Sequence, residues 1–311
     1  MKGIVLKLLL LALVFAGCDN NVKQTEEQNR NAVTEKSGKS YLTEEQLQEY
    51  INNKINIAFD LGNEFIIDEA ADVVYLIRNS VSSILKEEYA SAIENLTKAI
   101  AKARLIEKGN TQNVIAEVNI AVNQNVNDAE SATSIINQID SLMELGEIQR
   151  AKHLYAQLTN EINITKESIS IPDYLQVMNR ADVLMKNKEW DEALFVLNSI
   201  LGKSIIEKRT IPLPLLRAQR MVDEVEKLLG EEELKTENIG ILLTNAEYEI
   251  KFAKLLGYGK SEKEYKNILE ELASIKGSDL KENGEKLKSQ IKEFKNELNG
   301  LKNKISAYQK V

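Results

Sequence analysis

The sequence predicts a mainly α-helical protein built from repeated helical hairpins, with short extended segments between them and a heptad-patterned helix at the C-terminus. Two observations favour this class. A pattern of a large apolar residue, an alanine three positions later and a second large apolar residue four positions after the alanine recurs three times. Alternating apolar residues follow each copy. The three copies are Tyr89-x-x-Ala92-x-x-x-Leu96, Ile148-x-x-Ala151-x-x-x-Tyr155 and Trp190-x-x-Ala193-x-x-x-Leu197.

Each copy is typical of the turn between two packed helices. The large apolar residue opens the second helix, and the alanine one turn later lets the partner helix approach closely, as in tetratricopeptide-type hairpins. The copies start at positions 89, 148 and 190. These intervals miss the period of about 34 residues of such repeats. We therefore expect irregular hairpins rather than a regular solenoid.

Extended segments are expected after the hairpins. Residues 114–122 alternate apolar with mostly polar side chains, which is the period of a strand. Similar patterns occur at 162–171 and at 205–213, and they run into Pro172 and Pro212. Proline disfavours a helix just before it and suits the first turn of the next one. The sequence leaves open whether these segments pair into a sheet.

The N-terminus, residues 1–17, has the pattern of a bacterial signal peptide. Lys2 and Lys7 precede a short apolar run that ends at a small-residue pair. The run is shorter than the ~20 apolar residues that cross a bilayer. Cys18, the single cysteine of the 311-residue chain, follows directly. Phe-Ala-Gly-Cys at this place resembles a lipobox, although phenylalanine stands where leucine is usual.

We therefore predict that Cys18 is acylated and that the chain is a lipoprotein anchored to a membrane. More than one acyl chain is needed for stable anchoring, because a single chain binds only marginally. The alternative is a secreted protein with an incidental thiol. Residues 18–41 contain few apolar side chains and predict a flexible tether between the lipid and the folded part.

The predicted helical domain spans residues 42–275. It begins at a capping box, Thr43-Glu44-Glu45-Gln46. Two long helices are predicted to close it, at 215–229 and 238–256, and Gly257-Tyr258-Gly259 would stop the second. Residues 276–311 form a separate amphipathic helix whose apolar residues follow a heptad spacing. Two alternatives stay open for it: a parallel coiled coil, and packing on its own domain.

Composition argues against several classes of function. Removing Lys2 and Lys7 from the 40 basic residues leaves 38 against 48 acidic ones, which is unfavourable for nucleic-acid binding. The single histidine, His153, lies in a helical stripe and is expected to be a partly buried packing residue. Common zinc sites need several Cys or His ligands. We predict no catalytic residue, no cofactor and no metal site.

Several segments together resemble the YfdX family of bacterial envelope proteins. Residues 210–220, TIPLPLLRAQR, are followed by a helix and then by AEYEIKFAKLLGYG at 246–259. Upstream, residues 73–100 are similar to the first hairpin of that family, and Ile171-Pro172 to its middle extended stretch. The resemblance covers about residues 65–275. It implies an exported, mostly helical protein that is associated with envelope and acid-stress responses and has no established activity.

The expected function is that of a lipid-anchored envelope protein that acts by protein–protein interaction, facing the periplasm or the cell exterior. Its partners would be the membrane, through acylated Cys18, and an envelope protein or polypeptide that the sequence does not identify. Self-association into a homo-oligomer stays open. The alternative function is an envelope-stress chaperone or an acid-stress-responsive protein, whose response would come from carboxylates because only one histidine is present.

Overall fold

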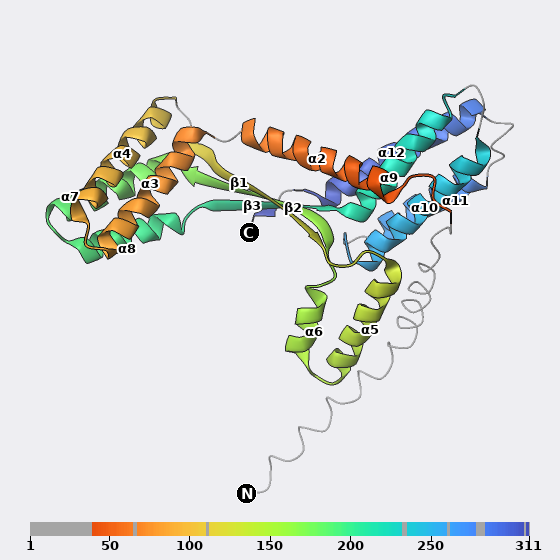
Figure 1. Ribbon diagram of the computed structural model, residues 1–311, viewed down its shortest axis with the longest axis horizontal. Coiled ribbons are helices and arrows are strands. Elements are labelled where there is room, and N and C mark those ends of the chain that lie inside the picture. Colours follow the sequence, from red (N-terminus) through yellow and green to blue (C-terminus); the bar gives the residue numbers. More distant parts are fainter. Residues whose placement is uncertain are drawn as a thin grey trace, which may run out of the picture. The chain divides into compact units, whose positions relative to one another are not determined.

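Helices make up most of the described part of the chain in this computed structural model (Figure 1), which confirms the predicted mainly α class. The described residues are 39–64, 67–109, 112–231, 235–259, 262–277, 284–307 and 309–310. The helices are α2 (Glu44–Glu64), α3 (Asp68–Leu85), α4 (Tyr89–Lys108), α5 (Ala129–Glu144), α6 (Ile148–Tyr155), α7 (Ile171–Lys186), α8 (Trp190–Leu201), α9 (Leu213–Leu228), α10 (Thr236–Leu255), α11 (Glu262–Lys276) and α12 (Gly284–Ile305).

The chain divides into two compact units, and each unit takes three separate stretches of sequence. The described residues of unit 1 lie within 39–42, 124–160 and 217–297, and those of unit 2 lie within 43–123, 161–216 and 298–310. Helix α12 contributes to both units.

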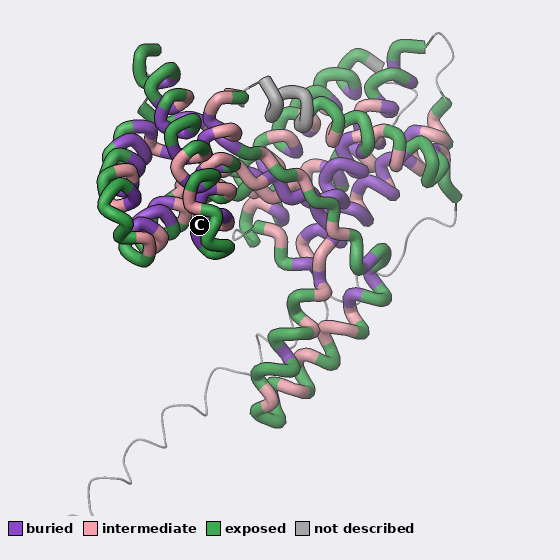
Figure 2. Tube along the Cα trace, turned by 60° about the vertical axis from the view of Figure 1, so that its left-hand side comes forward, coloured by how far each residue is buried: buried purple, intermediate pink, exposed green. Residues whose placement is uncertain are grey.

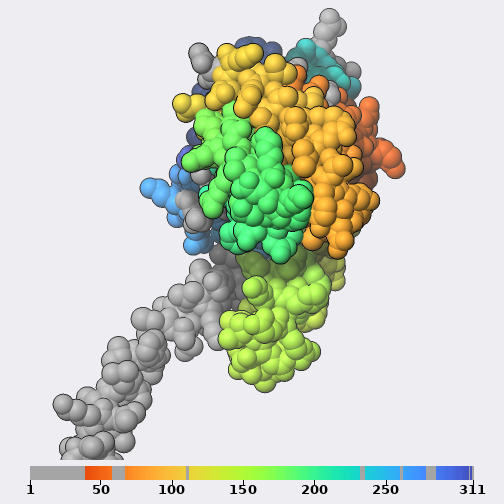
Figure 3. Space-filling model, turned by 90° about the vertical axis from the view of Figure 1, so that its left-hand side faces the viewer, coloured from red at the N-terminus to blue at the C-terminus, as the bar shows by residue number. Residues whose placement is uncertain are grey.

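Two helical hairpins form the main core of unit 2. Helices α3 and α4 pack on each other, α7 and α8 do the same, and α4 packs on α7 while α3 packs on α8. Figure 3 shows this arrangement as orange and yellow side chains of α3 and α4 against the green α7 and α8. Large apolar side chains from all four helices, such as Ile77, Leu96, Met178 and Leu197, are fully buried in this core.

The expected extended segments are strands, and they pair. Each follows a hairpin: β1 (Asn113–Gln124) follows α4, β2 (Asn160–Ser170) follows α6, and β3 (Ile205–Pro212) follows α8. They lie side by side in the order β1-β2-β3-β4, where β4 is the short strand Gln309–Lys310. Strands β2 and β3 are antiparallel, with Ile164 opposite Arg209. The question that the sequence left open is therefore answered: the segments form a small sheet.

A second core of unit 2 lies between this sheet and α2. Ile162 and Ile164 of β2 and Ile51 of α2 are buried in it. The predicted capping box starts α2: the Thr43 N–H donates to Gln46 Oε1 at 2.9 Å, and the Gln46 N–H donates to Thr43 Oγ1 at 3.3 Å. This reciprocal bonding satisfies two amides that the first helical turn leaves without intrahelical partners.

Unit 1 contains the α5–α6 hairpin, α10, α11 and most of α9 and α12. Helix α10 packs on α11 and on α5. Five side chains of the α12 stripe are at most 4% exposed, so this stripe is covered within the chain: Leu287, Ile291, Phe294, Leu298 and Leu301. Within unit 1, Lys295 of α12 also forms ion pairs with Asp223 and Glu226 of α9. In the described part of the chain, no helix has the length and hydropathy needed to span a bilayer.

Candidate binding groove on the α5–α6 hairpin

The three predicted turns share one backbone geometry. Helices α4, α6 and α8 begin at Tyr89, Ile148 and Trp190, the residues that open the sequence pattern. In each turn one residue has a positive φ, and the next amide donates to a carbonyl five residues back. This is a Schellman ending, which satisfies the last carbonyls of the first helix. The positive-φ residues are Glu87 (61°), Gly146 (75°) and Lys188 (63°).

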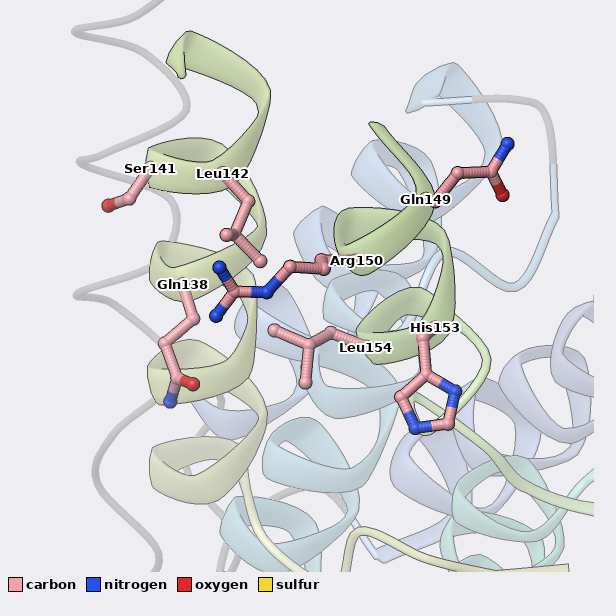
Figure 4. A pocket seen from close by; sticks show the side chains of 7 residues that line it. All are labelled: Gln138, Ser141, Leu142, Gln149, Arg150, His153 and Leu154. Atoms are coloured by element: carbon pink, nitrogen blue, oxygen red, sulfur yellow. The ribbon is translucent and has the colours of Figure 1, made fainter. Parts of the chain in front are cut away.

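A surface groove of about 570 Å³ lies on the α5–α6 hairpin. Figure 4 shows Leu142 of α5 and Leu154 of α6 pointing into the space between the two helices, with the side chain of Arg150 crossing between them toward Gln138. Both leucines are half-buried. Ser141, Gln149 and His153 complete the lining. The groove thus combines an apolar floor with one guanidinium and two amides.

The charges of the two helices differ in sign. Helix α5 contains Glu130, Asp140 and Glu144 and no basic residue, whereas α6 contains Arg150 and Lys152 and no acidic one. The Arg150 guanidinium forms an exposed ion pair with Glu147, in the turn between the helices. Exposed pairs of this kind stabilise a fold by at most about 1 kcal/mol, so Arg150 can exchange this partner for a bound carboxylate.

His153 is exposed at the edge of the groove. The prediction of a partly buried packing residue is therefore wrong for it. The stripe of α6 that packs on α5 passes through Ala151, which is 2% exposed. A helix turns by about 100° per residue, so His153 lies about 200° away from Ala151, on the opposite side of α6. Nor do the described residues contain a cluster of His, Cys, Asp and Glu that could hold a metal ion.

Tyrosines from the 246–259 segment hold the base of the hairpin. The Ala129 N–H, at the start of α5, donates to the Tyr248 hydroxyl at 2.9 Å, and the Asn160 N–H donates to the Tyr258 hydroxyl at 2.8 Å. Phe252 packs beside Tyr248 in the same core. Burial raises the pKa of Tyr248. The hydroxyl therefore stays protonated and neutral at physiological pH.

The two sequence motifs near residues 217 and 249 meet in a buried ion pair. Arg217 of α9 and Glu249 of α10 are 3% and 1% exposed, and Arg217 Nη1 lies 3.9 Å from Glu249 Oε1. Removing one partner of such a pair leaves a buried charge without its counterion, which costs about 3–5 kcal/mol. The pair therefore explains the arginine of TIPLPLLRAQR and the second glutamate of AEYEIKFAKLLGYG as structural residues.

A pair of carboxyls joins α11 to α12 within unit 1. Burial, followed by a hydrogen bond with Glu297 and repulsion from Glu297 and Glu293, raises the pKa of Glu271 to about 7. A raised carboxyl pKa can mark a general acid. Neither Glu271 nor Glu297 lines the hairpin groove or the smaller groove beside Lys254 and Lys266. Glu271 and Glu297 thus share a proton in a contact between α11 and α12.

Cys18, the one predicted modification site, lies outside the described residues. Its acylation stays a prediction. The groove residues Gln138, Leu142, Arg150 and Leu154 were not predicted from the sequence. A signal for them was present, since Arg150 and Leu154 lie about 100° and 60° around α6 from Ala151, the residue that packs on α5.

Comparison with known proteins finds one matching family over the middle of the chain. The model of the YfdX protein family matches residues 73–211. These residues include the first hairpin and Ile171-Pro172, whereas most of TIPLPLLRAQR and all of AEYEIKFAKLLGYG lie beyond the match.

Among solved structures, that of YfdX from Salmonella Typhi is similar at 14% sequence identity. The similarity covers 48% of this chain and 93% of that one, with a TM-score of 0.34. No curated protein matches. Residues 73–211 of this chain thus match the YfdX protein family.

Proposed function

We propose that this chain is a lipid-anchored envelope protein that acts without catalysis, by binding another polypeptide in the α5–α6 groove. Acylated Cys18 would fix it to a membrane, and residues 18–41 would act as the tether. The proposal has two parts, the anchor and the groove, and each has its own test.

The observation that carries the binding role is the chemistry of the groove lining. Leu142 and Leu154 offer apolar surface beside the Arg150 guanidinium and the Gln138 amide. Such a surface fits a polypeptide segment that carries an apolar side chain next to a carboxylate, because a guanidinium binds a carboxylate through two parallel hydrogen bonds. Apolar contact would supply most of the affinity, and the charged group would set the orientation.

Variants on the two sides of α6 test the binding role. The full chain is crosslinked in its own envelope, and captured partners are identified for the wild type, Arg150→Glu, Leu154→Asp and Lys152→Glu. The first two variants are expected to lose the main partner. Lys152→Glu makes the same charge change on the same helix, away from the groove, and is expected to keep it. Equal capture by all four chains, or no saturable partner, would refute binding in the groove.

The anchor is tested by labelling cells with a fatty-acid analogue. The wild-type chain is expected to carry the label and to sediment with membranes, whereas Cys18→Ser is expected to lose the label and appear in the soluble fraction. A wild-type chain without label would contradict the anchor. That result would not affect the binding role of the groove, which the Arg150, Leu154 and Lys152 variants test separately.

The second candidate function is an acid-stress chaperone, and the carboxyl pair of α11 and α12 favours it. Because the pKa of Glu271 is raised above its usual value, the folded state binds a proton more tightly than the unfolded state. The contribution of this group to stability is therefore fully present below pH ~4.5 and is lost as the pH rises toward 7. This contact would hold α11 on α12 in acid rather than release it.

Glu247 acts in the opposite direction. Burial alone would raise its pKa, but hydrogen bonds from Lys251 and Lys276 outweigh burial and hold the pKa below the usual value. The contribution of Glu247 to stability is therefore lost as acid protonates it. A chaperone that keeps its fold in mild acid is consistent with these two groups together.

The test compares the wild type with Glu271→Gln at pH 5 and pH 8. Glutamine cannot ionise, so we expect the variant to gain stability over the wild type at pH 8 but not at pH 5. Suppression of aggregation of an unfolded client protein is measured at the same two pH values. A chain that unfolds at pH 5, or that protects the client equally well at both values, would remove this candidate.

A further inference from the structure

We propose that the α5–α6 hairpins of two copies of this chain pair with each other, in the way that α3–α4 pairs with α7–α8 inside one copy. The three hairpins share their turn geometry, so their positions can be compared one by one. Two of the hairpins cover each other. In the third, the corresponding positions are exposed, and the occupant that fits them is a hairpin of the same kind.

The first comparison concerns the last turn of the first helix. Ile84 of α3 and Met185 of α7 stand five residues before Tyr89 and Trp190, and they are 5% and 1% exposed in the shared core. Met143 of α5 holds the same place relative to Ile148 and is 53% exposed. All three residues are large and apolar, but only Met143 is exposed to solvent.

The second helix gives the same result. Leu96 of α4 and Leu197 of α8 are fully buried, and both lie seven residues after the start of their helix. Tyr155 of α6 occupies the equivalent place and is 63% exposed, and Ile148 itself is 60% exposed. In Figure 2 the turn and the free end of this hairpin are mainly green, the colour of exposed residues. Together these residues form an apolar face, consisting of Met143, Ile148 and Tyr155.

The pairing inside unit 2 predicts the geometry of the dimer. It is reciprocal, because the first helix of each hairpin packs on the second helix of the other, α3 on α8 and α7 on α4. The equivalent residues Tyr89 and Trp190 stack with their ring centroids 4.1 Å apart. In a symmetric dimer the same rule brings α5 onto α6 of the second copy and Ile148 next to its own counterpart, as expected of an isologous interface.

The charges agree with this arrangement. Helix α5 carries only acidic charges and α6 only basic ones. Lys152 lies about 40° from Ile148 and about 60° from Tyr155 around α6, so packing α5 of one copy on α6 of the other brings this lysine toward the acidic α5 at both halves of the interface. A parallel arrangement of α5 on α5 would instead bring like charges together, so the charges favour the reciprocal pairing.

The apolar face is separate from the proposed binding groove. The groove uses Arg150 and Leu154, which lie about 100° to 160° around α6 from Ile148 and Tyr155, given a rotation of about 100° per residue. Dimer formation would therefore leave the groove open, and failure of one proposal would not decide the other.

Cysteine crosslinking tests the dimer in the full chain. Cys18 is the single native cysteine, so the wild-type chain gives the background. Ile148→Cys is placed where two copies of the residue would meet, and His153→Cys, exposed on the other side of α6, is the matched control. After mild oxidation of membranes that contain the protein, Ile148→Cys is expected to give a disulfide-linked dimer and His153→Cys is not.

A second variant separates a specific dimer from chance collision. Adding Met143→Asp to Ile148→Cys places a charge in the apolar face and is expected to lower the crosslinked fraction at least tenfold. Accessibility of the new thiol is checked with a maleimide. The proposal would be overturned by no dimer from an accessible Ile148→Cys, by equal dimer from His153→Cys, or by a crosslink from Ile148→Cys to a different protein.

Discussion

Two hairpins of unit 2 and the α5–α6 hairpin of unit 1 have the same turn but a different environment. At the turn between α3 and α4 and at the turn between α7 and α8, the large apolar residues lie in a common core. In the α5–α6 hairpin, Met143 and Ile148 beside the turn and Tyr155 at the end of α6 are more than half exposed. The base of this hairpin packs on α10, through a core that includes Ala132 and Phe252, but its free end is uncovered.

The difference shows that the sequence pattern determines the turn but not the partner of the hairpin. A monomeric soluble protein rarely leaves a contiguous apolar patch exposed, and such patches often mark interaction sites. The exposed residues of α5–α6 therefore make this hairpin a candidate site for a partner. The predictions below test this contrast, from the largest expected effect to the smallest.

Truncation of equivalent residues should give very different losses. Leu197→Ala empties a fully buried position in the paired hairpins and is expected to lower the free energy of unfolding by about 2–5 kcal/mol. Tyr155→Ala, at the equivalent exposed position, should change it by less than about 0.5 kcal/mol. Urea unfolding at low protein concentration measures both. Similar losses would mean that α5–α6 is covered within the chain.

Removing the Tyr248 hydroxyl should loosen only the α5–α6 hairpin. Tyr248→Phe leaves the buried Ala129 N–H without its hydroxyl acceptor, at a cost of about 1–3 kcal/mol. Hydrogen exchange is expected to speed up in the first turns of α5 and to stay unchanged in α3 and α4. Tyr75→Phe, on an exposed tyrosine of α3, is the control and should have no effect. A change spread over all three hairpins would contradict separate anchoring of α5–α6.

The turns themselves allow a matched comparison. Gly146 has a φ of 75°, and a Cβ there would meet no atom within 4 Å, so Gly146→Ala tests the backbone alone. We expect a loss of about 1–2 kcal/mol, the cost of the left-handed conformation for a residue with a side chain. Glu87→Gly and Lys188→Gly, at the equivalent positions, should remove this backbone strain but add the larger conformational entropy that glycine loses on folding. The two effects oppose each other, so we expect a net change of less than about 1 kcal/mol. Thermal unfolding measures all three, and a neutral Gly146→Ala would show that the turns differ.

The Tyr89–Trp190 stack should give the smallest effect. A double-mutant cycle with leucine at both positions is expected to show a coupling of about 0.5–1.5 kcal/mol, as for other stacked aromatic pairs. The same cycle between Tyr89 and Ile148 should give no coupling at protein concentrations where the chain is monomeric. A coupling of zero in the first cycle would mean that the Tyr89–Trp190 contact does not stabilise the paired hairpins. It would then be a poor template for the Ile148 contact in the proposed dimer.

Much of the local structure could be predicted from the sequence, because local physics decides it. The starts of α4, α6 and α8, the capping box at Thr43, the strands after each hairpin and the helix stop at Gly257 all follow from short patterns. The structure has each of them at the predicted place.

The long-range pairing could not be predicted in this way. Leu96, Tyr155 and Leu197 have the same apolar character in the pattern, and nothing near them in the sequence indicates that only two are buried. His153 was expected in a packed stripe because it stands beside Leu154, although its side chain is exposed in the structure. The groove was missed for the same reason, since its leucines and Arg150 come from two helices that meet only in the folded chain.

The most direct test of the contrast between the hairpins is hydrogen exchange of the full chain at increasing protein concentration. We predict that amides near the end of α5 and in α6 gain protection as the concentration rises, because a second copy covers Met143, Ile148 and Tyr155, while amides of α4 and α8 do not change. Exchange in α5 and α6 that does not depend on concentration, up to the level found in the membrane, would contradict the proposal that a second copy covers this face.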